Sequence, residues 1–252
     1  MNPEVCIHIN NLSKRYKKSD DDCLKQISLS INSGEKFGIL GPNGAGKTTL
    51  ISILCGVIPP SGGNYQYFEQ SRILQPHSVK KKIGFVPQDY SFYEDLTPSQ
   101  NIDYFGALYL LAKDEIKIRK EVILSALGLS KVADKKIRTF SGGLKRRMNL
   151  AIGIIHKPSI LFLDEPTVGA DVQSKYAMMQ YLNEVNKEGT TIIYTSHHMS
   201  EAEDFCNRIA LIDNGKLIAC DTLSNLFNFY KTSDLKSLFI NLTGESFRDF
   251  HV

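Results

Sequence analysis

Residues 41–48 read Gly-Pro-Asn-Gly-Ala-Gly-Lys-Thr and match the pattern GxxxxGK[ST] at every defined position. Glycines at this spacing let successive backbone N–H groups close around phosphate oxygens, and a helix that starts after the loop adds positive potential. We expect Lys47 to reach the β- and γ-phosphates of a nucleotide and the Thr48 hydroxyl to ligate Mg²⁺. The predicted phosphate-binding residues are Gly41, Pro42, Asn43, Gly44, Ala45, Gly46, Lys47, Thr48 and Thr49.

An acidic pair, Asp164 and Glu165, follows the apolar run ILFL at residues 160–163. At the carboxyl end of a buried strand, Asp164 can hold Mg²⁺ or its water, as such a residue does in phosphate-loop enzymes. Glu165 would point differently and could orient or deprotonate an attacking water. Alone, such a pair is also typical of a solvated loop or a helix start. Downstream of a phosphate loop, it predicts nucleotide hydrolysis.

The elements that position these groups read as buried strands. Three apolar runs end in polar residues: 35–40, 159–163 and 190–195, the last of which is followed by Ser196 and two histidines. Continuous apolar strands that end in polar loops favour a parallel sheet covered on both faces, with the chemistry at the strands' carboxyl ends. The predicted fold class is α/β.

Residues 89–156 differ from this pattern, because helical spacing replaces the strand signals. We predict helices over 98–111 and 114–127, and a third over 144–156 that Ser141 precedes. The region therefore reads as a helical subdomain inserted into the α/β core.

The chain accordingly divides into an α/β core, the inserted helical subdomain and a less patterned tail; these are residues 1–88 with 157–225, 89–156 and 226–252. Near the end of the core, two short apolar runs flank Asn214-Gly215. Asn-Gly between such runs is a strong hairpin signal. The runs 208–212 and 216–220 are expected to pair as antiparallel strands.

Composition places the chain among ordinary globular proteins, with 42% apolar and 23% charged residues in a length of 252. The net charge of +3 is too small to predict a partner. Nucleic-acid or anionic-lipid contact is open to the short basic clusters, but solvated surface is the preferred interpretation, and no nucleic acid is expected as a partner. These clusters lie within residues 14–18, 80–82 and 145–147.

The five cysteines form no CxxC pair, and an odd number favours free thiols in a reducing cytosol. The N-terminal segment lacks the apolar core of a signal peptide. No stretch has the length of apolar residues that crosses a bilayer. A role at a membrane would therefore be exercised from outside the lipid.

Residues 140–147, Phe-Ser-Gly-Gly-Leu-Lys-Arg-Arg, narrow the choice among phosphate-loop enzymes. They resemble the signature motif of the ATP-binding cassette (ABC) ATPases, which stands at the start of a helix upstream of the acidic pair. In that family this loop binds the γ-phosphate of the nucleotide held by the opposite subunit. Ser141 is a good N-cap, and Gly142 and Gly143 expose N–H groups at a positive helix end.

Further family elements follow in the expected order. Tyr16 resembles the aromatic residue that stacks on adenine, and Gln88 resembles the Q-loop glutamine that senses Mg²⁺ and the attacking water. Residues 168–171, Val-Gly-Ala-Asp, resemble the D-loop that crosses the dimer interface. His197 resembles the switch histidine that contacts the γ-phosphate, and His198 is interpreted as structural or exposed.

Two positions depart from the family pattern. The signature usually has glutamine where this chain has Leu144, and the D-loop usually has leucine where it has Ala170. Leu144 puts in doubt only that residue's own contribution near the partner's nucleotide. The SGG-apolar-KRR form resembles a subfamily that exports drugs, polysaccharides and similar loads, as do the segments after Gln88 and near the C-terminus.

The resemblance implies a phosphate-loop (RecA-like) ATPase core with an inserted helical subdomain. It further implies hydrolysis of ATP with Mg²⁺ held by Thr48, Gln88 and Asp164, with Glu165, His197 and Gln88 as the catalytic residues. Two copies, expected to be identical, would clasp two ATP molecules head to tail and dock on transmembrane permease subunits at the cytoplasmic face. Three alternatives stay open: an ABC ATPase that drives a non-transport assembly process, a nucleic-acid machine, and a non-hydrolysing nucleotide-binding module.

Overall fold

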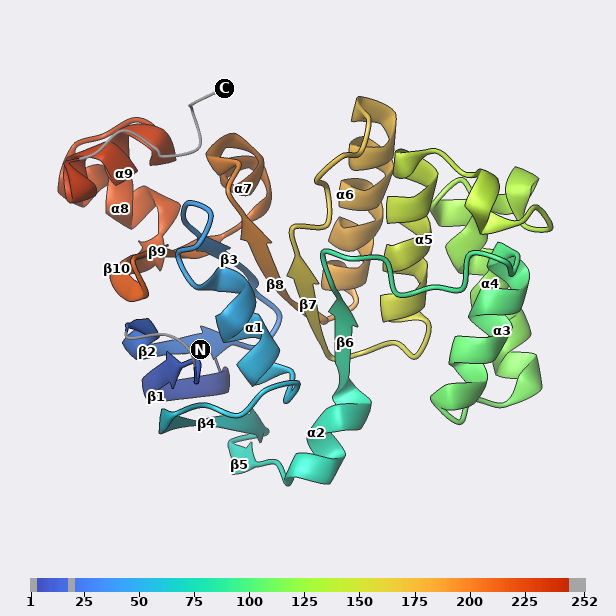
Figure 1. Ribbon diagram of the computed structural model, residues 1–252, viewed down its shortest axis with the longest axis horizontal. Helices are drawn as coiled ribbons and strands as arrows, with labels where there is room; N and C mark the ends of the chain where they lie inside the picture. The colour runs from blue at the N-terminus through green and yellow to red at the C-terminus, as the bar shows by residue number, and fades with distance from the viewer. Residues whose placement is uncertain (1–3, 18–20, 245–252) are drawn as a thin grey trace. The chain divides into compact units, whose positions relative to one another are not determined.

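The computed structural model describes residues 4–17 and 21–244, and it comprises two compact units (Figure 1). The first unit is Met1–Lys80 with Thr191–Val252, and the second is Lys81–Thr190. The three-part division expected from the sequence stays a prediction. Of its tail, residues 245–252 lie outside the described part of the chain, as does Lys18 of the first basic cluster.

An antiparallel sheet, which sequence analysis did not predict, occupies the N-terminal part of the first unit. Its strands, in the order β2-β1-β4-β5, are β2 (Asp22–Asn32), β1 (Val5–Arg15), β4 (Gly62–Glu69) and β5 (Arg72–Ile73). Positive φ angles at Asn11 (48°) and Gln26 (55°) coincide with shifts of register between β1 and β2. Such bulges break the period of two that marks a half-buried strand in a sequence.

The first unit also contains a second, mainly parallel set of strands. The strands, in the order β10-β9-β3-β8, are β10 (Lys216–Thr222), β9 (Arg208–Asp213), β3 (Lys36–Leu40) and β8 (Thr191–Ser196). β3 is parallel to both β8 and β9, whereas β9 and β10 form the predicted antiparallel hairpin. Its turn has φ angles of 47° at Asn214 and 74° at Gly215, so the hairpin prediction is confirmed.

Short helices surround these strands. They are α1 (Lys47–Leu54), α2 (Pro76–Lys82), α7 (Met199–Phe205), α8 (Leu223–Tyr230) and α9 (Leu235–Thr243). α1 contacts β2, α7 packs on β3 and β8, and α9 packs on α7 and α8. α9 and the C-terminal part of α8 fall in the predicted tail, residues 226–252, and the two helices start at side-chain caps, Thr222 for α8 and Asp234 for α9.

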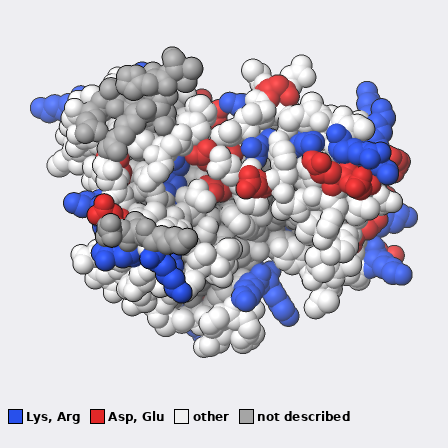
Figure 2. Space-filling model, in the orientation of Figure 1, with Lys and Arg blue, Asp and Glu red and all other residues white. Residues whose placement is uncertain are grey.

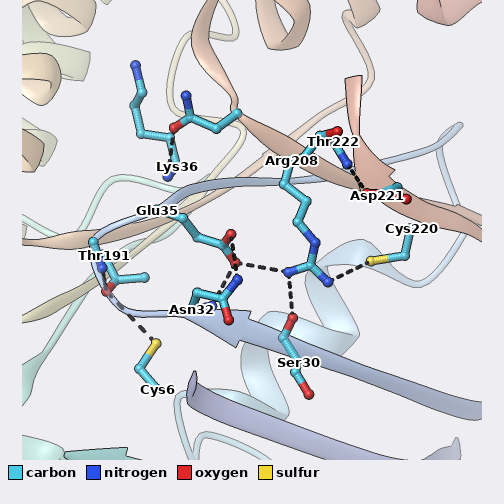
Figure 3. A network of polar contacts seen from close by, with 12 residues as sticks. Cys6, Ser30, Asn32, Glu35, Lys36, Thr191, Arg208, Cys220, Asp221 and Thr222 are labelled. Carbon is cyan, nitrogen blue, oxygen red and sulfur yellow. Dashed lines mark hydrogen bonds and ion pairs between the residues drawn. The ribbon is translucent and has the colours of Figure 1, made fainter. Parts of the chain in front are cut away.

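Arg208, the first residue of β9, joins the two sheets of the first unit (Figure 3). Its Nη1 donates to the Ser30 carbonyl oxygen of β2 at 2.8 Å and to Glu35 Oε1 at 3.2 Å. The guanidinium also lies over the Phe37 ring, 5.2 Å from its centroid. Hydrogen bonds to a charged donor are among the stronger ones in proteins. This arginine therefore fixes β2 against the strand next to β3.

All five cysteines lie in the described part of the chain and are free thiols there. Burial raises the pKa of the Cys6 thiol to about 11 and that of the Cys206 thiol to about 12. Both groups are therefore protonated and unreactive near neutral pH.

The second unit holds two parallel strands and a group of helices. These elements are β6 (Ile83–Val86), β7 (Ile160–Asp164), α3 (Pro98–Leu108), α4 (Lys113–Ala126), α5 (Gly142–Ile154) and α6 (Val172–Lys187), with 3-10 turns at Ser130–Val132 and Ile137–Thr139. α5 packs against β6, α3 and α6, and lies between α6 and α3 (Figure 1). The helices predicted in this region are confirmed. Their ends move by a few residues, because caps and not periodicity fix where a helix begins.

The basic cluster 145–147 bonds within the second unit. Lys145 pairs with Glu94 at 2.6 Å, and Arg147 Nη1 donates to the Leu127 carbonyl oxygen at 3.0 Å. On the face shown in Figure 2, basic and acidic side chains are intermingled over the region of α3, α4 and α5. No helix among the described residues is both long enough and apolar enough to cross a membrane.

Candidate nucleotide-binding and hydrolysis site

The phosphate loop joins the end of β3 to the start of α1 in the first unit. Gly46, the N-cap of α1, has a φ of 107°, which an L side chain rarely adopts. A Cβ there would lie 2.7 Å from Leu24 Cδ2 and 2.9 Å from the Cys23 carbonyl oxygen. Glycine is therefore required, and because it has no side chain it leaves the first amides of α1 to a ligand.

Lys47 folds back over this loop and is only 5% exposed. Its ammonium donates to the carbonyl oxygens of Gly41 at 2.8 Å and Pro42 at 3.1 Å. A buried ammonium needs such acceptors, because desolvation of the charge is costly. The charge is thus held at the loop itself. Thr48 is exposed on the first turn of α1, as an oxygen ligand for a metal must be.

The other residues of the predicted phosphate set line the same loop. Pro42 and Ala45 are buried, Asn43 and Gly44 are exposed, and Thr49 is half-buried. Tyr16 is 45% exposed, and its hydroxyl lies 3.2 Å from Thr49 Oγ1. The structure therefore brings Tyr16 to α1, beside the phosphate loop. An exposed ring in this position is free to stack on a planar base.

His197 leaves the strand next to the phosphate loop. β8 is parallel to β3, and Leu40 is in register with Ser196, so the two strands deliver residues 41 and 197 from neighbouring carboxyl ends. The Ser196 hydroxyl accepts a hydrogen bond from the His198 amide at 2.9 Å and so fixes the turn. His197 is half-buried and His198 is exposed.

In the second unit the acidic pair ends β7. Asp164 is 1% exposed and Glu165 is 6% exposed. Glu165 has a φ of 48°, in the left-handed region that only a few per cent of non-glycine residues occupy. Strained conformations of this kind concentrate at functional sites, where surrounding structure enforces them. Asp164 is the last residue of β7, so the two carboxylates leave backbone of different conformation, and their different roles stay a prediction.

Gln88 follows the strand beside the acidic pair. β6 and β7 are parallel with Val86 opposite Leu163, so Gln88 and Asp164 leave neighbouring strand ends. The Gln88 side chain is exposed, whereas its backbone carbonyl accepts a hydrogen bond from Arg146 Nη1. The backbone at Gln88 is thus held, while the exposed amide is open to a ligand.

The signature segment starts α5. Ser141 caps the helix, and its hydroxyl accepts a long hydrogen bond of 3.4 Å from the Leu144 amide. A Cβ at Gly143 would lie 2.2 Å from Asp171 Oδ2 and 2.3 Å from Ser174 Oγ. Glycine at this position is therefore required by the close approach of α6. Gly142 is exposed, and a Cβ there would come within 3.2 Å of the Gly169 carbonyl oxygen.

Asp171, the last residue of the D-loop segment, is the N-cap of α6. Its carboxylate accepts hydrogen bonds of 2.8 Å from both the amide and the hydroxyl of Ser174. These bonds, from the backbone amide first and then from the hydroxyl, lower the pKa of Asp171. Leu144 and Ala170, the two departures from the family pattern, are half-buried.

Two residues of α5 that sequence analysis missed hold the loops of this half-site. Arg146 Nε donates to the Val168 carbonyl oxygen at 2.7 Å in addition to its bond to Gln88. Asn149, 1% exposed, bonds to the segment around Gln88. The available signal was a lone amide within the apolar run Met148 to Ile155, because buried polar side chains need partners.

The predicted residues therefore fall into two groups. The first unit contains Tyr16, the phosphate loop with Thr48 and Thr49, and His197. The second unit contains Gln88, Asp164, Glu165 and the signature residues Ser141, Gly142 and Gly143. One group has the chemistry to hold phosphates, and the other has the carboxylates and the amide that hydrolysis requires.

Comparisons with known proteins identify the family of the chain. Residues 24–168 match the protein family described as "ABC transporter". The chain is 42% identical over 220 residues to the linearmycin resistance ATP-binding protein LnrL of Bacillus subtilis (strain 168), which covers 87% of this chain and 70% of LnrL. It is 32% identical over 238 residues to the ABC transporter ATP-binding protein NatA of the same strain, covering 93% and 97% of the two chains.

Solved structures show the same fold. A structure described as the ATP binding subunit of an ABC transporter has a TM-score of 0.84 at 24% identity and covers 94% of this chain and 99% of that one. A dimer of the ATP-binding cassette MJ0796 in a post-hydrolysis state, bound to ADP and Pi, has a TM-score of 0.75 at 26% identity, with coverage of 86% and 98%.

The fold and the site thus define an ATP-hydrolysing phosphate-loop protein. The chain belongs to the ABC transporter family, of which it is an ATP-binding and ATP-hydrolysing subunit.

Proposed function

We propose that this chain powers export of a substrate across a membrane, as one of two copies that dock on separate transmembrane permease subunits at the cytoplasmic face. The observation that carries the proposal is the similarity to LnrL over 87% of this chain. Exporter relatives with other loads support it, among them the Nod factor export ATP-binding protein I of Ralstonia nicotianae at 36% identity. Relatives with different loads support a class of function and not one substrate.

The first unit is the ATP-binding half in this proposal. The glycine N-cap of α1 and the ammonium of Lys47 above the loop fit a polyphosphate, because both present positive potential where the chain leaves β3. Tyr16 stacks on the adenine ring, and His197 contacts the γ-phosphate. Each of these groups is positioned by its own strand or helix, so little must move when the nucleotide binds.

Both units contain oxygen donors of the kind that Mg²⁺ prefers: the Thr48 hydroxyl in α1 of the first unit, and Asp164 and Gln88 in the second. Within the described residues, no three His, Cys, Asp or Glu side chains gather as a metal site. Mg²⁺ is commonly held by one or two protein oxygens together with substrate phosphates and water, for which Thr48, Asp164 and Gln88 provide the oxygens. When bound, Mg²⁺ neutralises charge on the phosphates.

Glu165 acts on the attacking water in this proposal. Its carboxylate accepts a hydrogen bond from the water and takes its proton as the water oxygen attacks the γ-phosphorus, while the bond from that phosphorus to the β–γ bridging oxygen breaks and ADP leaves. In this proposal Asp164, the last residue of β7, ligates the metal, and Glu165, which follows with a left-handed backbone, acts on the water. Gln88 orients the same water, and Ser141 of the second copy closes over the γ-phosphate.

Replacing Glu165 by Gln tests the proposal, since the amide keeps the shape and loses the base. We expect turnover to fall by about 10²- to 10⁴-fold, the usual contribution of general base catalysis. Nucleotide affinity should stay near that of wild type, and the variant should form dimers on addition of ATP. Steady-state ATPase assays, nucleotide titration and light scattering measure these three quantities.

Glu184→Gln is the matched control, because it makes the same chemical change at an exposed site on α6. A Glu165→Gln chain that stays monomeric with normal hydrolysis would show that Glu165 does not have this role. Copurification separates the classes of function: a polytopic membrane protein supports export, and a soluble scaffold supports the assembly alternative.

A further inference from the structure

Asn149 uses every hydrogen-bonding position of its side chain on one short segment of the second unit. Its Nδ2 donates to the carbonyl oxygens of Pro87 at 2.9 Å and Asp89 at 3.3 Å. Its Oδ1 accepts from the amide and the hydroxyl of Ser91, both at 2.9 Å. A primary amide offers two donors and two acceptor lone pairs, so the side chain is fully satisfied.

These contacts lie on both sides of Gln88. The carbonyl oxygens before and after it accept hydrogen bonds from Asn149 Nδ2, and its own carbonyl oxygen accepts one from Arg146 Nη1. Residues 146 and 149 are three apart on α5 and therefore share a face of that helix. Three successive carbonyls of an irregular segment are thus fixed by two side chains of the helix that begins at the signature motif.

Arg146 extends this hold to the segment after β7. Its Nε donates to the Val168 carbonyl oxygen at 2.7 Å, and its guanidinium carbon lies 4.8 Å from the centroid of the Tyr90 ring. The planar fork of a guanidinium binds two acceptors in a fixed geometry, which an ammonium cannot do. One side chain therefore couples the backbone at Gln88 to the backbone that follows Glu165.

We propose that Asn149 is a positioning residue for ATP hydrolysis: together with Arg146 it fixes the backbone of residues 87–91, so that the exposed Gln88 side chain is held ready for the metal and the attacking water. The inference rests on the role proposed above for Gln88. Without these bonds, the carbonyls at 87 and 89 would turn to other partners, and the Gln88 amide would sample many directions.

Asn149→Asp tests the proposal in the purified chain, with ATP as substrate and Mg²⁺ as the titrant. The aspartate keeps both acceptors toward Ser91 but loses both donors toward the carbonyls of Pro87 and Asp89. We expect kcat to fall about tenfold and the Mg²⁺ concentration for half-maximal rate to rise, as is typical when residues behind a metal ligand are changed. The KM for ATP should change little, because the phosphate loop belongs to the other unit.

Asn101→Asp is a matched structural control in the same unit. Asn101 is fully buried, donates to the carbonyl oxygens of Tyr93 and Thr97 at 3.0 Å, and accepts from the Tyr93 amide. The same chemistry thus holds a segment that does not flank Gln88. We expect a similar loss of thermal stability with no change in the Mg²⁺ midpoint. An unchanged midpoint in Asn149→Asp as well would overturn the proposal.

A double variant with Gln88→Ala identifies the residue through which Asn149 acts. If the two act together, Asn149→Asp adds no further shift in the Gln88→Ala background, whereas multiplied effects would contradict the proposal. A Gln88→Ala chain with wild-type rate and midpoint would instead show that the role of Gln88 is wrong. Should Asn149→Asp fail to fold, Arg146→Lys decides, because a lysine cannot bridge Gln88 and Val168. A shifted midpoint in that variant supports the proposal, and an unshifted one overturns it.

Discussion

The two helices that begin at predicted phosphate contacts, α1 and α5, start in opposite ways. α1 begins at Gly46, whose left-handed backbone and missing side chain leave the helix end to a ligand. α5 begins at Ser141, an extended residue whose own hydroxyl caps the helix. Near the start of α1 an ammonium is buried over the loop, whereas the carboxylate of Asp171 lies against Gly143 near the start of α5.

Because of this difference, the two helix ends suit different steps of the proposed cycle of ATP binding and hydrolysis. An uncapped helix end with a fixed cation attracts phosphate strongly and at all times. A helix end that is already capped, with a carboxylate close by, attracts an anion weakly. In the proposed dimer, ATP therefore binds first to the phosphate loop of one copy, and the signature loop of the other copy joins only when the two close.

Removing the Lys47 ammonium, which lies at the start of α1, should have the largest effect of the variants considered, on the affinity for ATP. Lys47→Ala deletes a charged donor that is proposed to contact phosphate, and hydrogen bonds of charged groups contribute about 1.5–3 kcal/mol each. We expect ATP affinity to fall by roughly 100-fold, which corresponds to about 2.7 kcal/mol. Titration with a fluorescent ATP analogue measures it. Lys120→Ala, which removes a lysine paired to Asp103 on the other unit, should bind like wild type.

If Lys47→Ala bound ATP as tightly as wild type, the start of α1 would not attract phosphate more strongly than the start of α5, and the proposed difference between the two helix ends would be wrong. The two ends also predict different consequences for hydrolysis. Loss of Lys47 should raise the KM for ATP, whereas loss of Glu165 should lower kcat with binding retained.

Gly143→Ala tests the start of α5, and we expect an intermediate effect, on the free energy of unfolding. The new methyl would meet the Asp171 carboxylate and the Ser174 hydroxyl at 2.2–2.3 Å, so either these side chains give up the hydrogen bonds that cap α6 or α5 moves from α6. Overpacking of this kind costs about 1–3 kcal/mol in the free energy of unfolding. Gly142→Ala, with its nearest contact at 3.2 Å, should cost less. Chemical denaturation of both variants measures the difference, and equal costs would refute the packing argument.

The two helix ends also differ in how much of their structure could be predicted from the sequence. The phosphate loop and the acidic pair could be located because each stands directly after an apolar strand, where local pattern decides the structure, whereas Gln88 was named from the family resemblance. The hairpin at Asn214-Gly215 was equally visible, since two residues determine that turn.

Features that depend on distant contacts could not be predicted in this way. Gly143 looks like a flexible signature glycine, yet the structure shows that α6 requires it. Asn149 seemed part of an apolar helix, and its partners lie some sixty residues away in the chain. The β1–β2 pair escaped detection because the bulges at Asn11 and Gln26 shift its register. Tertiary partners of this kind leave no local period to detect.

Changes at Ser141 should have the smallest effect on stability. They also separate its two roles, which are to cap α5 and, in the proposed dimer, to contact the nucleotide of the second copy. Ser141→Ala removes a cap whose hydrogen bond is already long at 3.4 Å, so the free energy of unfolding should fall by only about 0.5–1 kcal/mol. Ser141→Asp should restore that stability, because aspartate is a good N-cap and its charge favours a helix N-terminus.

The same aspartate would bring a negative charge to the place where the second copy's γ-phosphate is proposed to lie. In a Glu165→Gln background, we therefore expect ATP to drive dimer formation with Ser141, less with Ser141→Ala, and not at all with Ser141→Asp. Light scattering with and without ATP measures this order, and thermal melts report the cap separately. If the stable Ser141→Asp chain dimerised as well as its parent, α5 would be an ordinary capped helix. The nucleotide would then be held by the phosphate loop of one copy, without a contact from the signature segment of the other copy.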